Sequence, residues 1–378
     1  MSLNTNDLSL QRPTWAEIDL DALRSNFVKI QQRVAPAKIL AVVKSDAYGH
    51  GATVVARELE EAGASFLGTA TVAEAIQLRR ASIRLPILVL SGMTPEQIPL
   101  LQEFDFIPAV YNREVLNALG TYAEATGRPV AVHLKVNTGM GRLGFTPDDA
   151  TQILHSPPRG VKIEGLFTHF ATAEITDDAY TQLQLTHFRK LLDTSGAAGI
   201  LIHSANSAAL LNYADSHFDL VRPGLLLYGI SPTDDPLDFE PVLSLKSRII
   251  FLHWIHKGET IGYGRTFQAD KDTLIATIPI GYADGLRRLL SNRLQVEVSG
   301  AMCKIAGTIS MDLCTIDVTP VAEHAKLYEE VTLIGPKTPA TEWAKFLHTV
   351  PYEITCLIGS RVPRVYFKAG KIVDVYYP

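Results

Sequence analysis

The hydrophobic pattern divides the chain into two parts of different character. From about residue 38 to about residue 231, short β-branched and apolar runs alternate with longer segments of helical periodicity, and Gly, Pro, Asn or Asp separates them. Three of the helical segments span residues 51–62, 113–125 and 179–194. The eight candidate strands span residues 39–44, 66–70, 87–91, 106–111, 130–137, 163–169, 201–204 and 218–222. This α/β alternation predicts a TIM-like (β/α)8 barrel, with a doubly wound parallel sheet as the alternative.

A strand-like segment and a helix precede these units. Residues 15–20 have strand character, and residues 21–34 repeat apolar side chains at helical spacing, with Asp21 placed to cap the helix. The early strand is surplus to the eight, so we expect residues of about 14–20 to pair with the second part of the chain. In the helix of residues 179–194, the spacing predicts one shared apolar face for Tyr180, Leu183, His187 and Leu191.

The second part of the chain has mostly strand character. A polar, proline-rich stretch at residues 231–238 is typical of a linker. Beyond it, only residues 341–347 favour a helix. The candidate strands there span residues 242–255, 274–280, 294–298, 314–318, 331–334 and 365–377. We therefore expect a barrel domain over residues 1–235 and a β-rich C-terminal domain over residues 236–378.

Composition and charge narrow the partners. Lys and Arg number 35 against 40 Asp and Glu, a net charge of −5, so the chain offers no basic field for nucleic acid or an acidic membrane. The apolar runs fall short of the ~20 residues that span a bilayer, and the start lacks a signal-peptide core. The three cysteines follow no metal-ligand or disulfide pattern. These features predict a cytoplasmic protein that acts on a small molecule.

The candidate chemistry lies at the carboxyl ends of the barrel strands, where the βα loops of such folds form active sites. The first strand closes on Lys44. A lysine there either extends its ammonium into solvent or, with a lowered pKa, forms a Schiff base with a carbonyl compound.

The fifth strand leads into a glycine-rich loop. Residues 139–144 read Gly-Met-Gly-Arg-Leu-Gly and formally satisfy the G-x-G-x-x-G fingerprint of dinucleotide sites. That fingerprint belongs to the first βα turn of a doubly wound sheet, whereas four strands precede this one. The central Arg142 would also crowd a pyrophosphate. We therefore reject a dinucleotide site.

Later strand ends carry His169, His203 and Arg222. Two histidines could bind zinc, but no third strand end supplies an evident ligand, so we expect no metal. Hydroxyls and amides that could hold a phosphate are those of Tyr48, Asn206, Ser207, Gly224 and Leu225. A Schiff-base lysine and a phosphate site on one rim together imply pyridoxal 5′-phosphate.

With these residues in place, the chain resembles the alanine racemase family over nearly its whole length. The matching segments span residues 41–44, 48–51, 137–144, 167–170, 203–207, 222–224, 262–264, 280–285, 310–314 and 361–364. The resemblance implies a pyridoxal-phosphate barrel followed by a β domain. It also implies a homodimer with shared active sites, which interconverts L-alanine and D-alanine and supplies D-alanine for peptidoglycan.

The resemblance also implies roles for single residues. Lys44 would bind the cofactor and act as the base on the D face, and Tyr263 of the partner subunit would act on the L face. Arg222 would face the pyridine nitrogen, with His169 linking it to Tyr263 and His203 orienting it.

Further residues would contact substrate. Arg142 would reach the phenolic oxygen of the cofactor or the substrate carboxylate, and Met311 and Asp312 would bind substrate across the dimer. Tyr282 would narrow the entrance. Lys135 occupies a position that is a carbamylated lysine in some members, and Ser360 stands where some relatives carry a pocket-closing tyrosine.

Two other functions share parts of this pattern. A barrel-type amino-acid decarboxylase would hold a protonated pyridine nitrogen with a carboxylate, where this chain has Arg222. A non-enzymatic pyridoxal-phosphate carrier would lack the second domain, and with it Tyr263. Racemisation of another small amino acid, such as serine, stays open at this point.

Overall fold

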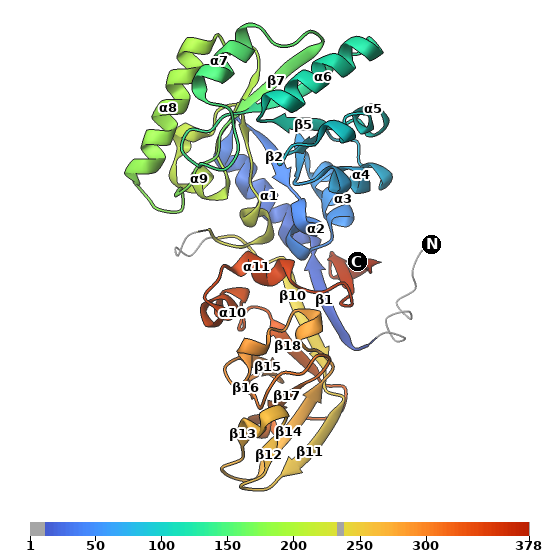
Figure 1. Ribbon diagram of the computed structural model, residues 1–378. Helices are drawn as coiled ribbons and strands as arrows, with labels where there is room; N and C mark the ends of the chain where they lie inside the picture. The colour runs from blue at the N-terminus through green and yellow to red at the C-terminus, as the bar shows by residue number, and fades with distance from the viewer. Residues whose placement is uncertain (1–11, 233–237, 378) are drawn as a thin grey trace. The chain divides into compact units, whose positions relative to one another are not determined.

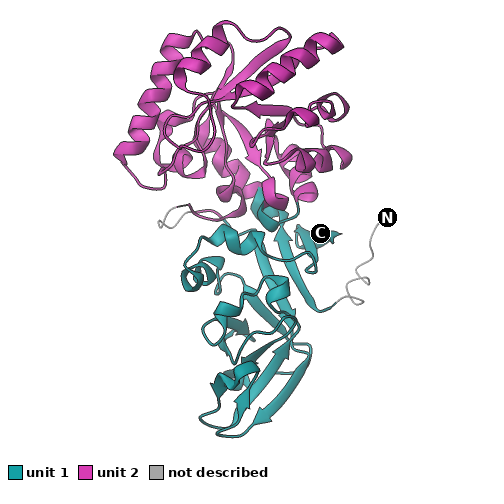
Figure 2. Ribbon diagram, in the orientation of Figure 1, with its two compact units in different colours: residues 1–23, 48–51, 240–378 teal, residues 24–47, 52–239 magenta. Residues whose placement is uncertain are grey.

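The computed structural model describes residues 12–232 and 238–377. The chain forms two compact units, coloured separately in Figure 2. Unit 1 comprises residues 1–23, 48–51 and 240–378, and unit 2 comprises residues 24–47 and 52–239. The division into domains 1–235 and 236–378 stays a prediction, and most of the expected linker lies outside the described residues.

Unit 2 contains the expected barrel. Its parallel eight-stranded sheet has the order β8-β7-β6-β5-β4-β3-β2-β9. Backbone hydrogen bonds from Asp219 to Ile202 and from Arg222 to Ala205 connect the two ends of this sheet. The strands are β2 (Lys38–Val42), β3 (Phe66–Thr69), β4 (Ile87–Val89), β5 (Ile107–Val110), β6 (Val130–Lys135), β7 (Val161–Phe167), β8 (Leu201–His203) and β9 (Leu220–Val221). The prediction of a (β/α)8 barrel is confirmed, and the doubly wound sheet is wrong.

Helices connect the barrel strands along the chain and lie around them in Figure 1. They are α2 (Lys44–Gly49), α3 (Ala52–Ala62), α4 (Val72–Arg80), α5 (Leu100–Phe104), α6 (Arg113–Thr126), α7 (Pro147–His155), α8 (Ala179–Ser195) and α9 (Ser207–Asn212). Their inner faces are apolar; Val55 and Leu59 of α3, for example, are fully buried. Burial of such faces is the main source of stability for helices of this length.

The apolar face predicted for α8 is wrong. Tyr180 and Leu183 are 43% and 46% exposed, and the helix instead buries Thr181 and Gln184 among its apolar residues. These polar side chains are satisfied by hydrogen bonds: Thr181 bonds to Asp178, while Gln184 accepts from the amide of Ala171 and donates to the carbonyl of His169. The hydrophobic pattern gave the wrong face because Thr181 and Gln184 are polar, as solvent-facing residues usually are, yet are buried with hydrogen-bond partners.

The first helix, α1 (Leu20–Val34), begins one residue earlier than expected. Oδ1 of Asp19 accepts hydrogen bonds from the amides of Asp21 and Ala22, so Asp19 caps the helix and the cap expected at Asp21 is wrong. Asp21 lies inside the first turn, and its carboxylate accepts from the amide of Ala369.

Unit 1 is built on a ten-stranded sheet with the order β11-β14-β17-β16-β15-β18-β10-β1-β19-β20. Strand β1 (Thr14–Asp19) pairs antiparallel with β10 and parallel with β19. The other strands are β10 (Leu243–Arg248), β11 (Phe251–Ile255), β14 (Thr273–Ile278), β15 (Gln295–Val298), β16 (Ala301–Ile305), β17 (Cys314–Asp317), β18 (Glu330–Ile334), β19 (Arg364–Lys368) and β20 (Lys371–Tyr376). A separate ribbon pairs β12 (Thr260–Ile261) with β13 (Phe267–Gln268).

Sequence patterning captured most of this sheet, and three details escaped it. The run expected as one strand over residues 365–377 is the antiparallel pair β19 and β20. The run expected as one strand over residues 242–255 is two strands, β10 and β11. Strand β16 was not predicted; it pairs with β15 through a turn in which Ser299 and Gly300 have φ of 47° and 85°. The helices of this unit are α10 (Ala340–Leu347), as expected, and α11 (Pro351–Cys356), which was not. Among the described residues, no helix is both long enough and apolar enough to cross a membrane.

Candidate active site

Five polar side chains stand at or just beyond the carboxyl ends of barrel strands. Because the strands are parallel neighbours, these ends lie on one rim of the barrel. The residues are Lys44 after β2, Lys135 at the end of β6, His169 after β7, His203 at the end of β8, and Arg222 after β9. We had expected Lys44 to close its strand. Instead, β2 ends at Val42 and Lys44 begins α2.

The turn that follows Lys44 is left-handed. Ser45, Asp46, Ala47 and Tyr48 all have φ between 52° and 55°. For L residues this conformation costs roughly 1–2 kcal/mol each. Within unit 2, hydrogen bonds hold it: the amide of Ser45 donates to Glu74, and the amide of Ala52 donates to Asp46, both at 2.7 Å. Strain of this kind, sustained by its surroundings, is typical of functional sites.

Arg222 is the most heavily bonded group at the rim. It is buried, and Phe167 lies beneath its guanidinium, 5.3 Å from ring centroid to Cζ. Its nitrogens lie near four partners: Thr168 O at 2.8 Å, Ser204 O at 2.8 Å, His203 Nδ1 at 2.9 Å and His169 Nδ1 at 3.2 Å. Burial lowers the pKa of Arg222 to about 9, so the group remains cationic at neutral pH.

Arg222 fixes the protonation of both histidines. A guanidinium has no acceptor, so Nδ1 of His169 and Nδ1 of His203 must accept. Both rings are therefore neutral, with the proton on Nε2. Burial, reinforced by the Arg222 charge, lowers the pKa of each well below the usual range, which agrees with this assignment.

Lys135 adds a second buried cation. Its Nζ lies 5.4 Å from the centroid of the Phe167 ring, which also stacks on His203 with 4.7 Å between centroids. Burial, followed by the charges of Arg222, Arg142 and Lys44, lowers its pKa to about 8. The rim therefore concentrates positive charge, an environment that favours an anionic ligand.

Arg142 lies on the loop between β6 and α7. Oδ1 of Asn137 accepts hydrogen bonds from the amides of Gly139 and Gly141 and folds the loop back on itself. A Cβ on Gly144 would lie 2.4 Å from the amide nitrogen of Asn137, so this position requires glycine. Arg142 is exposed on this loop, and α7 begins only at Pro147.

Four of the expected phosphate-binding residues, Asn206, Ser207, Gly224 and Leu225, lie on two neighbouring segments of unit 2. The amide of Gly224 donates to Oγ of Ser207 at 2.9 Å, which links the start of the 3-10 helix Leu225–Tyr228 to the start of α9. Oδ1 of Asn206 accepts from the amide of Ala209 and caps α9.

Unit 1 brings Tyr263, Tyr282 and Met311 together, whereas Arg142, also expected to contact substrate, belongs to unit 2. The carbonyl of Tyr263 accepts from Thr308, and the amide of Tyr282 donates to the carbonyl of Ser310, next to Met311. Tyr263, Tyr282 and Met311 are 72%, 40% and 52% exposed.

An ion-pair network supports this group of loops. The carboxylate of Asp284 is fully buried and accepts from Nε and Nη2 of Arg361, while Nη1 of Arg361 donates to Asp312 at 2.8 Å. Arg361 therefore links the buried carboxylate of Asp284 to the exposed carboxylate of Asp312.

Tyr48, the remaining expected cofactor residue, belongs to unit 1. Its ring lies edge-on to Tyr352, with 6.5 Å between centroids. Burial raises the pKa of its phenol. A Cβ on the following Gly49 would overlap the carbonyl of Thr355, so the chain passes too close there for any other residue.

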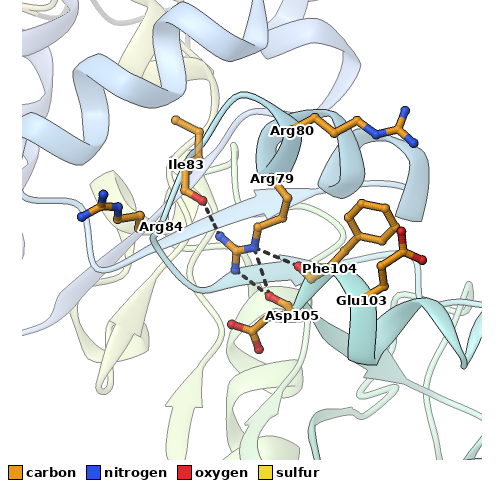
Figure 3. Close-up of a pocket in the computed structure, with 7 residues that line it drawn as sticks. All are labelled: Arg79, Arg80, Ile83, Arg84, Glu103, Phe104 and Asp105. Atoms are coloured by element: carbon orange, nitrogen blue, oxygen red, sulfur yellow. Dashed lines mark hydrogen bonds between the residues drawn. The ribbon is translucent and has the colours of Figure 1, made fainter.

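A pocket elsewhere on unit 2 is lined by an arginine whose hydrogen bonds hold the surrounding loops. It lies where β4 and β5 begin, at the end of the barrel opposite the rim, and Arg79 is at its centre (Figure 3). Arg79 donates hydrogen bonds to the carbonyls of Ile83, Leu85, Phe104 and Asp105. The Arg79 guanidinium thus stabilises the loops that precede β4 and β5.

Comparison with known proteins decides the family. The models of the alanine racemase N-terminal and C-terminal domains match residues 18–232 and 242–366. The chain belongs to the alanine racemase family. An alanine racemase of Desulforamulus reducens is 42% identical over 369 residues, which cover 94% of this chain and 100% of that protein.

Solved alanine racemases have the same fold. That of Clostridium difficile 630 matches with a TM-score of 0.92 at 36% identity, covering 96% of this chain and 98% of that one. That of Bartonella henselae, with covalently bound pyridoxal phosphate, matches with a TM-score of 0.87 at 30% identity, covering 94% and 99%. The resemblance to alanine racemases inferred from the motifs is confirmed.

Two rim residues were not expected from the sequence. Phe167 contacts both cations, and His133 lies 2.8 Å from His203, Nδ1 to Nε2. A signal for His133 was present: in a strand, residues two apart share a face, so His133 shares a face with Lys135.

Proposed function

We propose that this protein is a pyridoxal-phosphate-dependent alanine racemase, which interconverts L-alanine and D-alanine and supplies D-alanine for peptidoglycan. The observation that carries the proposal is the barrel rim, where Lys44, Lys135 and Arg222 meet two neutral histidines. Membership of the alanine racemase family supports it.

The residues of the rim fit the cofactor. Pyridoxal phosphate has a phosphate, a phenolic oxygen and an aldehyde, so it needs anion-binding groups and one amine. The charges of Lys44, Arg142 and Arg222 all lower the pKa of Lys135, which shows that cations crowd one another there. An anionic ligand relieves that repulsion.

Each part of the cofactor would have a partner in this chain. Lys44 would bind the aldehyde, as the covalent pyridoxal phosphate of the Bartonella henselae protein suggests. Arg222 would face the pyridine nitrogen, and Arg142 the phenolic oxygen or the substrate carboxylate. Residues assigned to the phosphate are Tyr48, Asn206, Ser207, Gly224 and Leu225.

Racemisation needs two proton carriers, because the proton leaves one face of Cα and another arrives on the opposite face. When bound, the cofactor withdraws electrons from Cα and makes its proton more acidic. Lys44 would carry the proton on the D face and Tyr263 on the L face. A phenol with an ordinary pKa of ~10 needs help to act as a base, which His169 and Arg222 would supply through hydrogen bonds.

Arg222 suits racemisation in particular. Because it can only donate, Arg222 would leave the pyridine nitrogen without a proton of its own and would weaken the withdrawal of electrons into the ring. Negative charge would then stay closer to Cα, where the proton must return. A carboxylate at the position of Arg222 would instead favour reactions of pyridoxal phosphate other than racemisation.

We further propose a homodimer in which Tyr263, Tyr282, Met311 and Asp312 complete the site of the partner subunit. The exposure of large apolar side chains supports this, since a second copy would bury them. Leu289 and Leu313, at 71% and 43% exposed, belong to the same unit. We also propose a cytoplasmic location, in line with three cysteines that form no disulfide.

The direct test is conversion of L-alanine. The purified protein loaded with pyridoxal phosphate should form D-alanine, measured by chiral chromatography, and Lys44→Ala should not. Borohydride reduction followed by peptide mapping should place the cofactor on Lys44. Absence of D-alanine from the loaded protein would overturn the function, and a label on Lys135 or Lys304 would overturn the site.

A further inference from the structure

His133 lies behind the groups already described and takes no part in the proposed chemistry. It stands in β6 and is fully buried in the barrel. Its Nδ1 lies 2.8 Å from Nε2 of His203, and the two rings meet edge-on with 5.0 Å between centroids. His203 in turn contacts Arg222 through its other nitrogen.

Arg222 determines the direction of the hydrogen bonds that connect it to His203 and His203 to His133. The guanidinium only donates, so Nδ1 of His203 accepts and the single proton of that ring is on Nε2. Nε2 of His203 must then donate to Nδ1 of His133. The proton of His133 is consequently on its own Nε2.

Two local features of the barrel, a shift of strand register and a glycine, leave space for the His133 ring. The pairing of β6 with β7 shifts register after Val132, so that His133 lies opposite Gly165. A Cβ on Gly165 would lie 2.4 Å from Nδ1 of His133, so only glycine leaves the space. The bulge and the glycine thus both serve this one side chain.

Packing alone does not explain a histidine here. Nε2 of His133 is buried without a hydrogen-bond partner among the described residues, which an apolar side chain of similar volume would avoid. Phe66, whose ring centroid is 6.0 Å away, offers only an aromatic contact. What histidine provides, and an apolar residue does not, is the acceptor for His203.

We propose that His133 is a positioning residue that fixes the tautomer of His203 and, through it, the orientation of the Arg222 guanidinium. Without an acceptor, Nε2–H of His203 would be buried unpaired. The ring would then gain by turning or by moving its proton to Nδ1, and either change removes the acceptor that Arg222 uses. Burial and the Arg222 charge lower the pKa of His133 to about 4, so the ring stays neutral and able to accept.

The tautomer is measured first, because that measurement does not depend on catalysis. The full chain, loaded with pyridoxal phosphate and labelled with ¹⁵N in its histidine rings, is examined by long-range ¹H–¹⁵N correlation. His203 should show its proton on Nε2 and a bare Nδ1, with signals assigned through their loss in His203→Asn. A proton on Nδ1 of His203, or a charged ring, would overturn the proposal.

Two substitutions of His133 then separate the effect of its acceptor atom from the effect of its side-chain volume. His133→Gln keeps an oxygen that can accept, whereas His133→Met fills similar space with no comparable acceptor. The Met variant should lose the defined tautomer of His203 while the Gln variant retains it. His217, whose Nε2 lies 3.0 Å from the carbonyl of Leu210, serves as an internal control and should not change. An unchanged His203 spectrum in the Met variant would contradict the proposal.

The catalytic consequence rests on the proposed function. Groups that orient a working side chain usually contribute roughly 10- to 100-fold to activity, and we expect His133→Met to lower kcat by that amount, with little change in KM. His133→Gln should restore most of the rate. If even the wild type fails to racemise alanine, the proposed function fails while the tautomer result stands; equal kcat in all three proteins would overturn the catalytic part of the inference.

Discussion

Nη1 of Arg222 lies 2.9 Å from Nδ1 of His203, and the arginine is the donor in this contact. The same guanidinium also donates to the carbonyls of Thr168 and Ser204, which directly follow β7 and β8. Each hydrogen bond of this buried cation, among the described residues, runs to an acceptor. A guanidinium has no acceptor atom and keeps its protons at neutral pH, so Arg222 can only donate.

This arrangement predicts the effect of replacing Arg222. Arg222→Glu introduces a carboxylate that can hold a proton on the pyridine nitrogen, so racemisation should fall by roughly 10²–10³-fold while pyruvate appears as a by-product. Rates of D-alanine and pyruvate formation are measured together. Arg222→Lys, which keeps the charge, serves as the control and should form no excess pyruvate. Loss of both activities in parallel would show that the substitution only damages the site.

Lys135 predicts a pH dependence of stability. Its pKa is lowered to about 8, against ~10.4 for an unfolded lysine. Below about pH 8 both states bind the proton, and the folded state bears the full penalty of the buried charge. Between about pH 8 and about pH 10 the folded state has released the proton and the unfolded state has not, so the free energy of unfolding rises.

The comparison with Lys135→Met isolates this group. Urea midpoints of the two proteins, measured from about pH 7.5 to about pH 9.5, should diverge in favour of the wild type as the pH rises. A constant difference between the midpoints would mean that Lys135 titrates as an ordinary lysine.

The shared site predicts complementation. Lys44→Ala and Tyr263→Phe should each be inactive, but random 1:1 mixing gives half mixed dimers with one intact site of two, or about a quarter of wild-type activity. Activity is followed after subunit exchange, itself verified with differently tagged chains. If mixed dimers form and remain inactive, Lys44 and Tyr263 do not meet across an interface.

Ser360 predicts the discrimination between substrates. It is exposed, and with serine in place of a larger side chain we expect measurable turnover of L-serine beside alanine. A pocket distinguishes one small group by roughly 10- to 200-fold, and Ser360→Tyr should raise the alanine-to-serine ratio of kcat/KM within that range. Ser360→Ala is the matched control. An unchanged ratio in Ser360→Tyr would mean that other residues, such as Tyr282 or Tyr352, set the specificity.

The sequence was most informative where one periodicity or one costly residue dominated. Every barrel strand was located because buried parallel strands are continuous apolar runs. Lys44 stood out because a lysine beside such a run is expensive to bury. The left-handed turn after Lys44 could not be read, since Ser45, Asp46 and Ala47 are not glycines.

The missed features depend on contacts between distant segments. His133 is explained only by His203, seventy positions later. Thr181 and Gln184 resemble a solvent face until their partners are known. The cap at Asp19 is different, because its hydrogen bonds to the amides of Asp21 and Ala22 are local. His133 and Gln184 require tertiary structure that local patterning does not contain.

Exchange of the Cα hydrogen in D₂O, measured separately for each enantiomer with Tyr263→Phe, tests the two-base account most directly. Loss of a general base costs ~10²–10⁴-fold, so exchange into L-alanine should fall by that amount. Lys44 is untouched, so D-alanine should still exchange and be recovered deuterated with its configuration retained. Equal loss of exchange from both enantiomers, or unimpaired exchange of L-alanine, would contradict the assignment of Tyr263 to the L face.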